Sequence, residues 1–569
     1  MEKLSIFKRL IGLLEPSEKS RYFRHAVMSL FSILLDVFSI SMLLPILRRI
    51  SSSGYADRHT VMIIFALGFL MLVKGIFDLW LVRLQNRWRC ESVQKLSSKV
   101  YSLLLREDLM DHNDRNEGEI ITCVRSDVAA SMATLSTVEG ILANVFSFIG
   151  CLCILVYAIG WLGLVCGAVY VVAVIIVHAL NNNKTFVLGE KLRKLEMSLI
   201  GMIGSSFYSY KEVKNDSRKD RLESKFGGVA QEYSSVSQRY SMLSSMLGSF
   251  LQSMIQAAIF FLLLLVVTMD VNLVSIIPSL IVLITVIIKM IPMALGVIGG
   301  LNSMSFARKA CLSTLDNMDK YRRVKADEEE QSHIRHKQVT INDSLKIKDL
   351  TFAYPNGKLI FDHAEMEVPV GKSVAVIGPS GEGKTTLLDL VVGLLKPQSG
   401  SILFDDYDIV THTDNEGECI ADMGSIVSYI PQFIAVGHNT VRDIVSFMAT
   451  PEDVDEERLV NCLKCAKIYD DVMEMPDGLD TMLGHSGHVI SGGQKQRLGL
   501  ARALYKDFEL LVMDEATAAL DMGTEMAVID SIREMKKGKT LLIVTHHKSL
   551  SDECEIIYRI EDKKLKRIR

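Results

Sequence analysis

The sequence predicts a helical membrane region followed by an α/β domain. Six apolar stretches lie within the first 300 or so residues, and each is about as long as the roughly 20 residues that a helix needs to cross a bilayer. From about residue 340 onward, short β-type runs alternate with helical segments, a pattern typical of α/β domains. The mean hydropathy is +0.25 although 23% of the residues are charged, because an apolar half is averaged with a polar one.

Length and composition exclude several classes of protein. A chain of 569 residues predicts several domains at about 100–200 residues each. Lys and Arg number 63 against 67 Asp and Glu, so no basic field points to a nucleic-acid partner. The ten cysteines are scattered, and Cys462 and Cys465 form a single pair without the second pair that a zinc site needs, so we expect reduced, structural cysteines. The polar start of the chain argues against a cleaved signal peptide.

The apolar stretches are expected to be six transmembrane helices. The third and fourth form a run too long for one crossing, and Gly160 between them predicts a helical hairpin. The expected spans are 26–47, 61–82, 141–159, 161–180, 246–269 and 275–298.

Basic residues predict the orientation of these spans. Lys and Arg are frequent before the first span and in the second-to-third and fourth-to-fifth connections, whereas Gly160 and 270–272 lie in turns without them. Arg48, Arg49 and Arg58 on the other side weaken the rule there. We expect both termini and the α/β domain to be cytoplasmic, with a transmembrane domain over 1–301, a linker over 302–341 and the α/β domain over 342–569.

A glycine-rich loop in the α/β domain predicts a nucleotide site. Residues 374–378 (VAVIG) form a strand-like run that leads into 378–385 (GPSGEGKT), which matches G-x-x-x-x-G-K-[ST]. Backbone N–H groups of such a loop surround phosphate oxygens, Lys384 reaches the β- and γ-phosphates, and the Thr385 hydroxyl faces Mg²⁺. The expected cofactors are ATP and Mg²⁺. The expected binding residues here are Gly378, Pro379, Ser380, Gly381, Glu382, Gly383, Lys384, Thr385 and Thr386.

Two carboxylates follow a buried strand further along the chain. Residues 510–515 read LLVMDE, which places Asp514 and Glu515 at the end of an apolar run. We expect Asp514 to hold Mg²⁺ through water and Glu515 to act as the general base on the attacking water. An apolar strand that ends in Asp-Glu is common, but the upstream loop makes this one specific.

Between these elements, residues 490–497 (ISGGQKQR) resemble the signature sequence of ATP-binding cassette (ABC) transporters. Further matches occur in the order of that family: Tyr354 where an aromatic ring stacks on adenine, Gln432 after a strand, Asp521 in 519–521 (ALD), and His546 after the last strand. Six spans followed by one cassette resemble an ABC exporter half-transporter, so the resemblance covers essentially the whole chain.

The resemblance implies a mechanism and a partner. In this family two cassettes close head to tail, so that each ATP lies between one glycine-rich loop and the partner's signature segment. It implies that Ser491, Gly492, Gly493 and Gln494 complete the ATP site together with Tyr354 and Asp521. It also implies catalytic roles for Glu515, His546, Gln432 and Lys384, and metal contacts from Thr385, Gln432 and Asp514. One chain carries one cassette, so a homodimer is the simplest assembly.

The sequence departs from the family pattern at four positions. Ile490 stands where Leu is usual, and Ala518 where Ser is usual. His485 replaces a Glu in a segment that contacts membrane helices in the family, which puts that contact in doubt, and His547 replaces an Arg. None of these changes removes a residue needed for hydrolysis.

The membrane half offers weaker signals. We expect short cytoplasmic coupling helices near 116–124 and 206–213. Charged residues are costly inside a span, where they either serve the cargo or stabilise the helices. Lys74 and Asp78 are spaced to neutralise each other, and His178 is placed to extend toward the interface. Candidates for a cavity are Asp36, Lys289 and the polar stripe Ser245, Ser249, Gln252 and Gln256.

The first span suggests a cargo. Residues 34–45 place an acidic residue ahead of a proline and resemble the exporter subgroup that contains bacterial flippases for polyprenyl-diphosphate-linked oligosaccharides. Arg48, Arg49 and Arg58 would suit a diphosphate, although interfacial anchoring explains them equally well. We therefore expect an ATP-driven exporter of a lipid-linked oligosaccharide or another amphipathic lipid in the cytoplasmic membrane of a bacterium. A peptide or multidrug exporter is the alternative, and a non-transporting membrane ABC regulator is the alternative from another class.

Overall fold

The computed structural model divides into two compact units. Unit 1 comprises Met1–Glu107 and Asp111–Lys325, and unit 2 comprises Asp108–Met110 and Ala326–Arg569. The structure describes residues 2–53, 57–113, 115–215, 219–268, 273–331, 334–337, 341–414, 417–421, 423–437, 439–447, 449–484, 489–516, 522–535 and 538–569.

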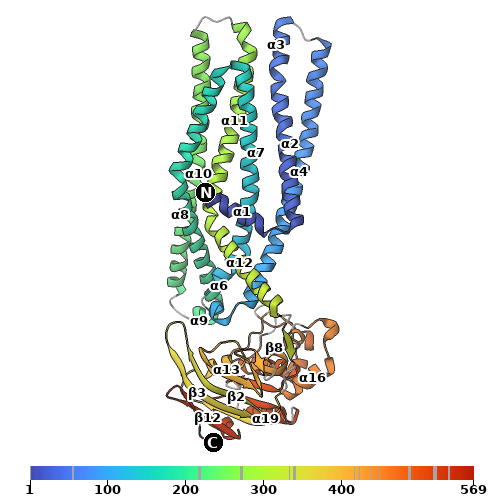
Figure 1. Cartoon of the computed structure of the whole chain (residues 1–569), viewed down its shortest axis with the longest axis vertical. Helices are drawn as coiled ribbons and strands as arrows, with labels where there is room; N and C mark the ends of the chain where they lie inside the picture. Colours follow the sequence, from blue (N-terminus) through green and yellow to red (C-terminus); the bar gives the residue numbers. More distant parts are fainter. Residues whose placement is uncertain are drawn as a thin grey trace. The chain divides into compact units, whose positions relative to one another are not determined.

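Unit 1 is built from long helices that run side by side (Figure 1). Its described helices are α1 (Glu2–Leu13), α2 (Pro16–Ser41), α3 (Leu43–Ser53), α4 (Arg58–Arg106), α5 (Leu109–Asn113, partly in unit 2), α6 (Glu117–Thr122), the π-helix η1 (Cys123–Asp127), α7 (Val128–Ile159), α8 (Trp161–Tyr208), α9 (Tyr210–Asn215), α10 (Lys219–Thr268), α11 (Leu273–Phe306) and α12 (Arg308–Gln331).

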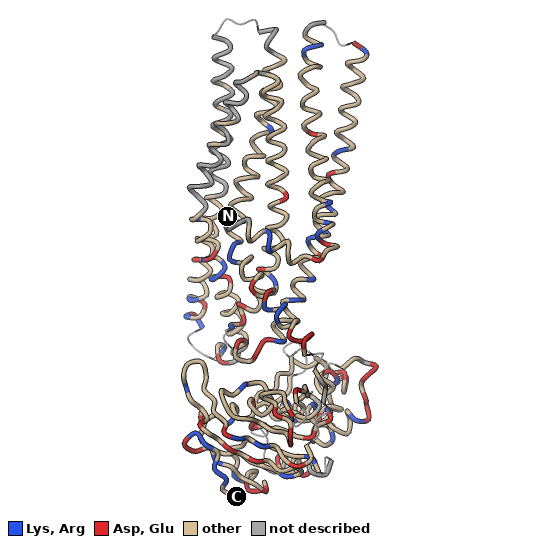
Figure 2. The backbone as a smooth tube through the Cα atoms, viewed as in Figure 1, with Lys and Arg blue, Asp and Glu red and all other residues tan. Residues whose placement is uncertain are grey.

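Over their described residues the six predicted spans fall on helices of unit 1, and the first, 26–47, crosses from α2 into the short α3. Within the described residues, four segments are long and apolar enough to cross a membrane: Pro16–Ser51, Arg58–Arg106, Glu117–Ala158 and Pro278–Phe306. The stretches 161–180 and 246–268 lie on α8 and α10, where most side chains fall outside the described part. Figure 2 shows that charged residues are sparse along the apolar stretches and frequent toward α6 and α9.

Exposed apolar stripes on these helices are typical of lipid-facing surfaces. Along α4, Phe65, Leu72 and Leu79 are between 71% and 76% exposed. On α2, Val27 and Leu34 are about two-thirds exposed at 65% and 66%. A protein in water does not leave such long contiguous apolar surfaces uncovered, so these helices are suited to a hydrocarbon environment.

Local sequence explains where the helices break. Pro45 has no N–H to donate to the carbonyl of Ser41, and the regular helix is interrupted at Met42 between α2 and α3. Gly160 separates α7 from α8 with a φ of 67°, a conformation that glycine adopts at little cost. The helical hairpin expected at Gly160 is therefore present.

The segment 302–341, which we expected to be a linker, is largely helical. α11 continues to Phe306 and α12 follows it. The buried residues Cys311, Leu315 and Met318 recur along one face of α12 and pack with α1, α4 and α7. These few buried residues, spaced three or four positions apart, are enough to pack α12 into the core, although the helix as a whole is strongly polar.

Unit 2 contains two described sheets. One runs in the order β1-β8-β7-β6-β5-β2-β3 and the other in the order β13-β12-β4-β11-β10-β9. The described strands are β1 (Arg335–Lys337), β2 (Ser344–Ala353), β3 (Leu359–Pro369), β4 (Ser373–Ile377), β5 (Ser399–Phe404), β6 (Tyr407–Asp408), β7 (Thr413–Asp414), β8 (Gly417–Ala421), β9 (Val427–Ile430), β10 (Leu510–Asp514), β11 (Thr540–Val544), β12 (Ile556–Glu561) and β13 (Lys564–Arg567).

Helices cover the second sheet, whose strands β9, β10, β11, β4 and β12 are parallel to their neighbours. Val374 and Val376 of β4 join one hydrophobic cluster while Ala375 between them joins the other, as expected for a strand buried on both faces. The described helices of unit 2 are α13 (Lys384–Val391), α14 (Met423–Ile426), α15 (Val441–Val445), η2 (Pro451–Asp453), α16 (Glu456–Cys465), α17 (Tyr469–Met473), η3 (Gly478–Asp480), α18 (Gly492–Tyr505), α19 (Met522–Met535) and α20 (Lys548–Asp552).

Candidate functional site

Four parallel strands of the second sheet end at the same edge. β4 leads into the glycine-rich loop, β10 ends at Asp514, β11 leads to His546, and β9 ends shortly before Gln432. Ligands of open parallel sheets bind outside the carboxyl ends of the strands. The sheet therefore gathers at one edge residues from four separate parts of the sequence.

The loop after β4 has the backbone shape that phosphate binding requires. Gly381 and Gly383 have φ values of 85° and 99°. A Cβ on Gly383 would lie 2.2 Å from the Cγ2 atom of Ile360, so the loop has no room for a side chain there. Gly383 is the N-cap of α13, and the free N–H groups at this helix start are suited to an anion.

Lys384 is buried inside the loop. Its ammonium donates to the carbonyl oxygens of Gly378 at 2.9 Å and Pro379 at 3.0 Å. Burial lowers the pKa of Lys384, against the opposing effect of the Glu515, Asp514 and Glu382 charges. A phosphate at the loop would therefore contact an ammonium group that is poorly hydrated.

Thr385 and Asp514 meet where a divalent cation would be needed. The Thr385 hydroxyl donates to the Oδ2 atom of Asp514 at 2.8 Å, and Asp514 is 2% exposed. Burial raises the pKa of Asp514. A hydroxyl and a carboxylate are oxygen ligands of the kind that Mg²⁺ prefers, with phosphates and water completing the shell, so these residues fit the metal.

Glu515 lies between two polar side chains. One carboxylate oxygen, Oε1, is 2.7 Å from Nε2 of His546, and the other, Oε2, accepts a hydrogen bond from Nε2 of Gln432 at 2.9 Å. Glu515 has a φ of 47°, a strained conformation for a residue with a side chain. Its backbone N–H donates to the Val544 carbonyl at 3.0 Å, which holds the residue in place.

The remaining predicted binding residues of the cassette lie as follows. The hydroxyls of Tyr354 and Thr386 are 2.9 Å apart, and the Tyr354 ring packs edge-on against Phe352. The Ser491 hydroxyl accepts a hydrogen bond from the Gln494 N–H at 3.2 Å and caps α18. Gly492 and Gly493 form the first turn of that helix.

Several predicted residues lie outside the described part of the chain. Asp521, Ala518 and His485 are among them. His547, by contrast, is described, and its Nδ1 atom lies 3.2 Å from Oε2 of Glu525, a residue that is 1% exposed.

Charged residues of three membrane helices form one network. Lys74 of α4 donates to Asp78 at 2.6 Å and lies 3.2 Å from Asp36 of α2. Lys289 of α11 lies 3.3 Å from the same oxygen of Asp36. Lys74 and Asp78 do pair at the predicted spacing, but the sequence did not show that Asp36 joins them to a third helix. Ser32 also donates to Asp78.

The other membrane candidates fall into two groups. The side chains of His178, Ser245, Ser249, Gln252 and Gln256 are outside the described part of α8 and α10. Arg48, Arg49 and Arg58 are exposed, and the Arg48 guanidinium lies 6.0 Å from the centre of the Tyr157 ring. Short helices, α6 and α9, lie at both places where we predicted coupling helices.

One buried ion pair in unit 1 gave no signal in the sequence. Arg193 of α8 donates to both carboxylate oxygens of Asp127, at 2.9 Å from Nε and 2.6 Å from Nη2. Asp127 ends the π-helix η1, whose extra residue per turn shifts the side chains that follow. A π-turn inside a helical pattern cannot be read from hydrophobic spacing.

Comparisons with known proteins agree with this geometry. Residues 361–518 match the ABC transporter family model. The chain is 34% identical over 224 residues to the ATP-dependent lipid A-core flippase of Ralstonia nicotianae, and 32% identical over 219 residues to that of Salmonella typhimurium. Each match covers 38% of this chain, and the chain spans about a third of the length of these relatives, 36% in both cases.

A solved structure extends the likeness to the fold of the whole chain. It is titled a bacterial Atm1-family ABC exporter with ATP bound, and it matches with a TM-score of 0.75 at 21% identity. The match covers 95% of this chain and 94% of the other, which confirms the predicted fold class. Residues 361–518 thus match the ABC transporter family, and the chain as a whole has the fold of an ABC exporter.

Proposed function

We propose that this protein is an ATP-driven exporter that works as a homodimer and moves an amphipathic lipid-linked cargo across the cytoplasmic membrane of a bacterium. The observation that carries the proposal is the arrangement around Glu515. Its carboxylate contacts His546 and Gln432, while the neighbouring Asp514 contacts Thr385 beside the glycine-rich loop. These are the parts that hydrolysis of a nucleoside triphosphate requires.

Each residue has a role that its contacts support. The loop N–H groups and Lys384 bind the phosphates, and Tyr354, whose hydroxyl contacts Thr386 in the first turn of α13, offers an aromatic ring that can stack on adenine. Bound Mg²⁺, held by Thr385 and Asp514 with the Gln432 amide oxygen, would neutralise charge on the phosphates. Glu515 takes a proton from the attacking water.

His546 and Gln432 are proposed to position Glu515 and the water. The 2.7 Å contact with His546 fixes one carboxylate oxygen, and the 2.9 Å hydrogen bond from Gln432 fixes the other. A base fixed in this way loses little freedom when the water binds, which lowers the barrier. His546 can also donate to a γ-phosphate oxygen.

The signature segment supports the homodimer. Ser491 begins α18, a helix of 14 residues, and the free N–H groups at its start are suited to a γ-phosphate. One chain has one glycine-rich loop and one such segment, so two identical chains facing each other would build two complete ATP sites.

The cargo assignment rests on the membrane half and on the relatives. The two relatives named above are called lipid A-core flippases, which favours a lipid with a polar headgroup. The four charged residues of the Asp36–Lys74–Asp78–Lys289 network lie within spans, where such groups are costly and mark functional sites. Within this class we propose a lipid-linked oligosaccharide.

The test is the ATPase activity of the purified protein in lipid nanodiscs, with a polyprenyl-diphosphate oligosaccharide, a peptide panel or hydrophobic drugs added. We expect the glycolipid alone to stimulate hydrolysis. Stimulation by peptides or drugs alone would overturn the cargo and favour the alternative exporter. No hydrolysis under any condition would overturn the function itself and favour a non-transporting regulator.

A further inference from the structure

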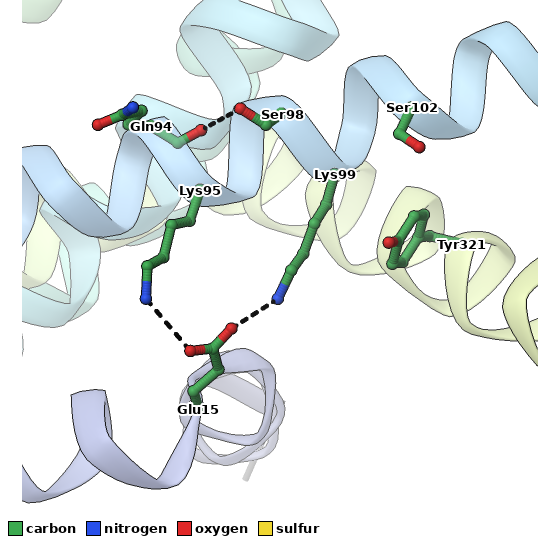
Figure 3. A pocket seen from close by; sticks show the side chains of 7 residues that line it. All are labelled: Glu15, Gln94, Lys95, Ser98, Lys99, Ser102 and Tyr321. Atoms are coloured by element: carbon green, nitrogen blue, oxygen red, sulfur yellow. Dashed lines mark hydrogen bonds and ion pairs between the residues drawn. The ribbon is translucent and has the colours of Figure 1, made fainter.

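A pocket lined by two lysines lies at the corner where α1 meets α2. The cavity has a volume of about 360 Å³. Lys95, Ser98, Lys99 and Ser102 of α4 line one side, Glu15 of the corner lies opposite, and Tyr321 of α12 closes one end (Figure 3). All of these residues belong to unit 1, and none has a role in the ATP site or the charged network of the spans.

The two lysines share the carboxylate of Glu15, and Lys95 also lies 3.2 Å from Oε1 of Glu18, whose side chain is 5% exposed. Lys95 donates to the Oε2 atom of Glu15 at 3.2 Å, and Lys99 donates to the Oε1 atom of the same residue at 3.2 Å. Residues four apart on a helix project from the same face, so both ammonium groups point into the pocket (Figure 3). Glu15 thus occupies the point where the positive charges of both side chains meet.

The side chain of Glu15 can move away from the two lysines without disturbing the helices. Its backbone N–H donates to Glu18 at 3.1 Å, and its carbonyl accepts from the Lys19 N–H at 2.9 Å, so the main chain is fixed by the start of α2. The side chain is 43% exposed and can rotate into solvent. Exposed ion pairs of this kind are weak, so an external anion competes with Glu15 at little cost.

We propose that this pocket binds a phosphate-bearing anion, which displaces the Glu15 carboxylate from Lys95 and Lys99. Two oxygens of a phosphate have nearly the spacing of the two carboxylate oxygens that the lysines already contact. A phosphate carries up to twice the charge of a carboxylate, and lysine is a common phosphate ligand as a point charge. The hydroxyls of Ser102 and Tyr321 lie beside the lysines and add neutral donors (Figure 3).

The phosphate can belong to a lipid headgroup or to a soluble compound, since both present the same oxygens. The soluble probe is inorganic pyrophosphate, titrated into the full-length protein by calorimetry. The lipid probe is phosphatidylglycerol, compared with phosphatidylcholine by counting lipids retained in native mass spectrometry. All proteins carry Lys384→Ala, which removes the lysine of the glycine-rich loop and makes the readout independent of ATP hydrolysis.

The lysine variant and the Glu15 variant are expected to change anion binding in opposite directions, which identifies the pocket as the binding site. Lys95→Gln with Lys99→Gln is expected to weaken pyrophosphate binding, or phosphatidylglycerol retention, by about tenfold or more. Glu15→Gln is expected to tighten the same binding by about threefold or more, because it removes the internal competitor. Arg87→Gln with Arg89→Gln removes the same charge from another part of α4 and is expected to change binding by less than about twofold.

The results separate the sources and decide the proposal. Binding of pyrophosphate would identify the ligand of the pocket as a soluble phosphate compound. Selective retention of phosphatidylglycerol would identify it as a lipid headgroup. The proposal is overturned if neither probe binds, if Glu15→Gln weakens binding or leaves it unchanged, or if the Arg87 and Arg89 control loses as much as the lysine variant. The Glu15 variant keeps the test decisive even if the lysine variant folds poorly.

Discussion

His546 and Glu515 contact each other across the carboxyl ends of two neighbouring strands, with 2.7 Å between Nε2 and Oε1. β10 and β11 pair in parallel with Asp514 opposite Val544, so the residues that follow each strand are brought together by the register of the sheet. The contact therefore depends on the whole sheet being correctly paired, although its two residues are 31 positions apart in the sequence.

Replacing Glu515 by Gln keeps the side-chain shape and removes the base. We expect the ATPase rate to fall by about 10² or more, because proton transfer by a positioned group contributes about that much. ATP binding should persist, so nucleotide recovered from the purified variant should be ATP rather than ADP. The matched control is Glu457→Gln, a change at an exposed position of α16, which should hydrolyse ATP at the normal rate.

Gly383→Ala tests the shape of the phosphate loop. The φ of 99° and the predicted Cβ contact of 2.2 Å with Ile360 are both unfavourable for alanine. We expect the affinity for a fluorescent ATP analogue to fall at least about tenfold, together with about 2 kcal/mol or more of stability.

Gly393→Ala provides the comparison for that variant. Gly393 has a φ of 79° but an added Cβ would meet nothing within 4 Å. It should lose some stability and keep normal nucleotide affinity. Equal nucleotide affinity in both variants would show that the loop shape at Gly383 does not matter for binding.

Asp127→Asn tests the Asp127–Arg193 ion pair of unit 1. The Asp127 side chain is 2% exposed and that of Arg193 is 15% exposed, so the change leaves a poorly hydrated guanidinium without its counter-charge. We expect a loss of about 3–5 kcal/mol, seen as a lower melting temperature of the purified protein.

Asp319→Asn is the surface counterpart. Asp319 pairs with Arg9 at 2.6 Å, with exposed fractions of 40% and 46%, and such pairs contribute at most about 1 kcal/mol. Similar melting temperatures for the Asp127 and Asp319 variants would mean that the Asp127–Arg193 pair does not stabilise unit 1.

The carboxyl group of Asp389 on α13 is expected to make the stability of the folded protein depend on pH. Burial, with a smaller effect from the Asp514 charge, raises the pKa of Asp389 to about 6. The carboxyl of an unfolded chain titrates near 3.9. Between these values the folded protein binds more protons than the unfolded chain, so this group's contribution to stability is present below about pH 4 and is lost as the pH rises through about 6.

Asp389→Asn should therefore raise the melting temperature at pH 7.5, by the equivalent of about 1–2 kcal/mol when partial hydration of the carboxylate is allowed for. The gain should shrink as the pH is lowered toward 4.5. Asp552→Asn, an exposed control, should show no such trend. A constant gain at all pH values would exclude the titration of Asp389 as its cause.

Residues 378–385 predicted the nucleotide site because the chemistry of phosphate binding restricts residue types at fixed spacing, and residues 490–497 predicted the cassette through their resemblance to the ABC signature sequence. The spans were predictable because a bilayer sets their length. The strand ends that gather Gly378, Gln432, Asp514 and His546 also followed from the alternation of strands and helices, since a parallel sheet places all of them at one edge.

Other features depend on packing that no local pattern reveals. α12 is a helix because Cys311, Leu315 and Met318 find a core to pack against, although its composition is that of a linker. Lys289 joins Asp36 only because α11 lies beside α2 in the folded bundle. The bridge from Glu15 to Lys95 and Lys99 joins residues about 80 positions apart, and neither end of it has an unusual sequence context.

We propose that hydrolysis at Glu515 drives movement of a lipid-linked cargo. The most direct measurement is the movement of a fluorescent polyprenyl-diphosphate oligosaccharide across proteoliposome membranes, with the unaltered protein and with Glu515→Gln. We predict movement that requires ATP and is lost in the variant. Movement at the same rate without ATP, or at the same rate in both proteins, would show that hydrolysis at Glu515 does not drive it.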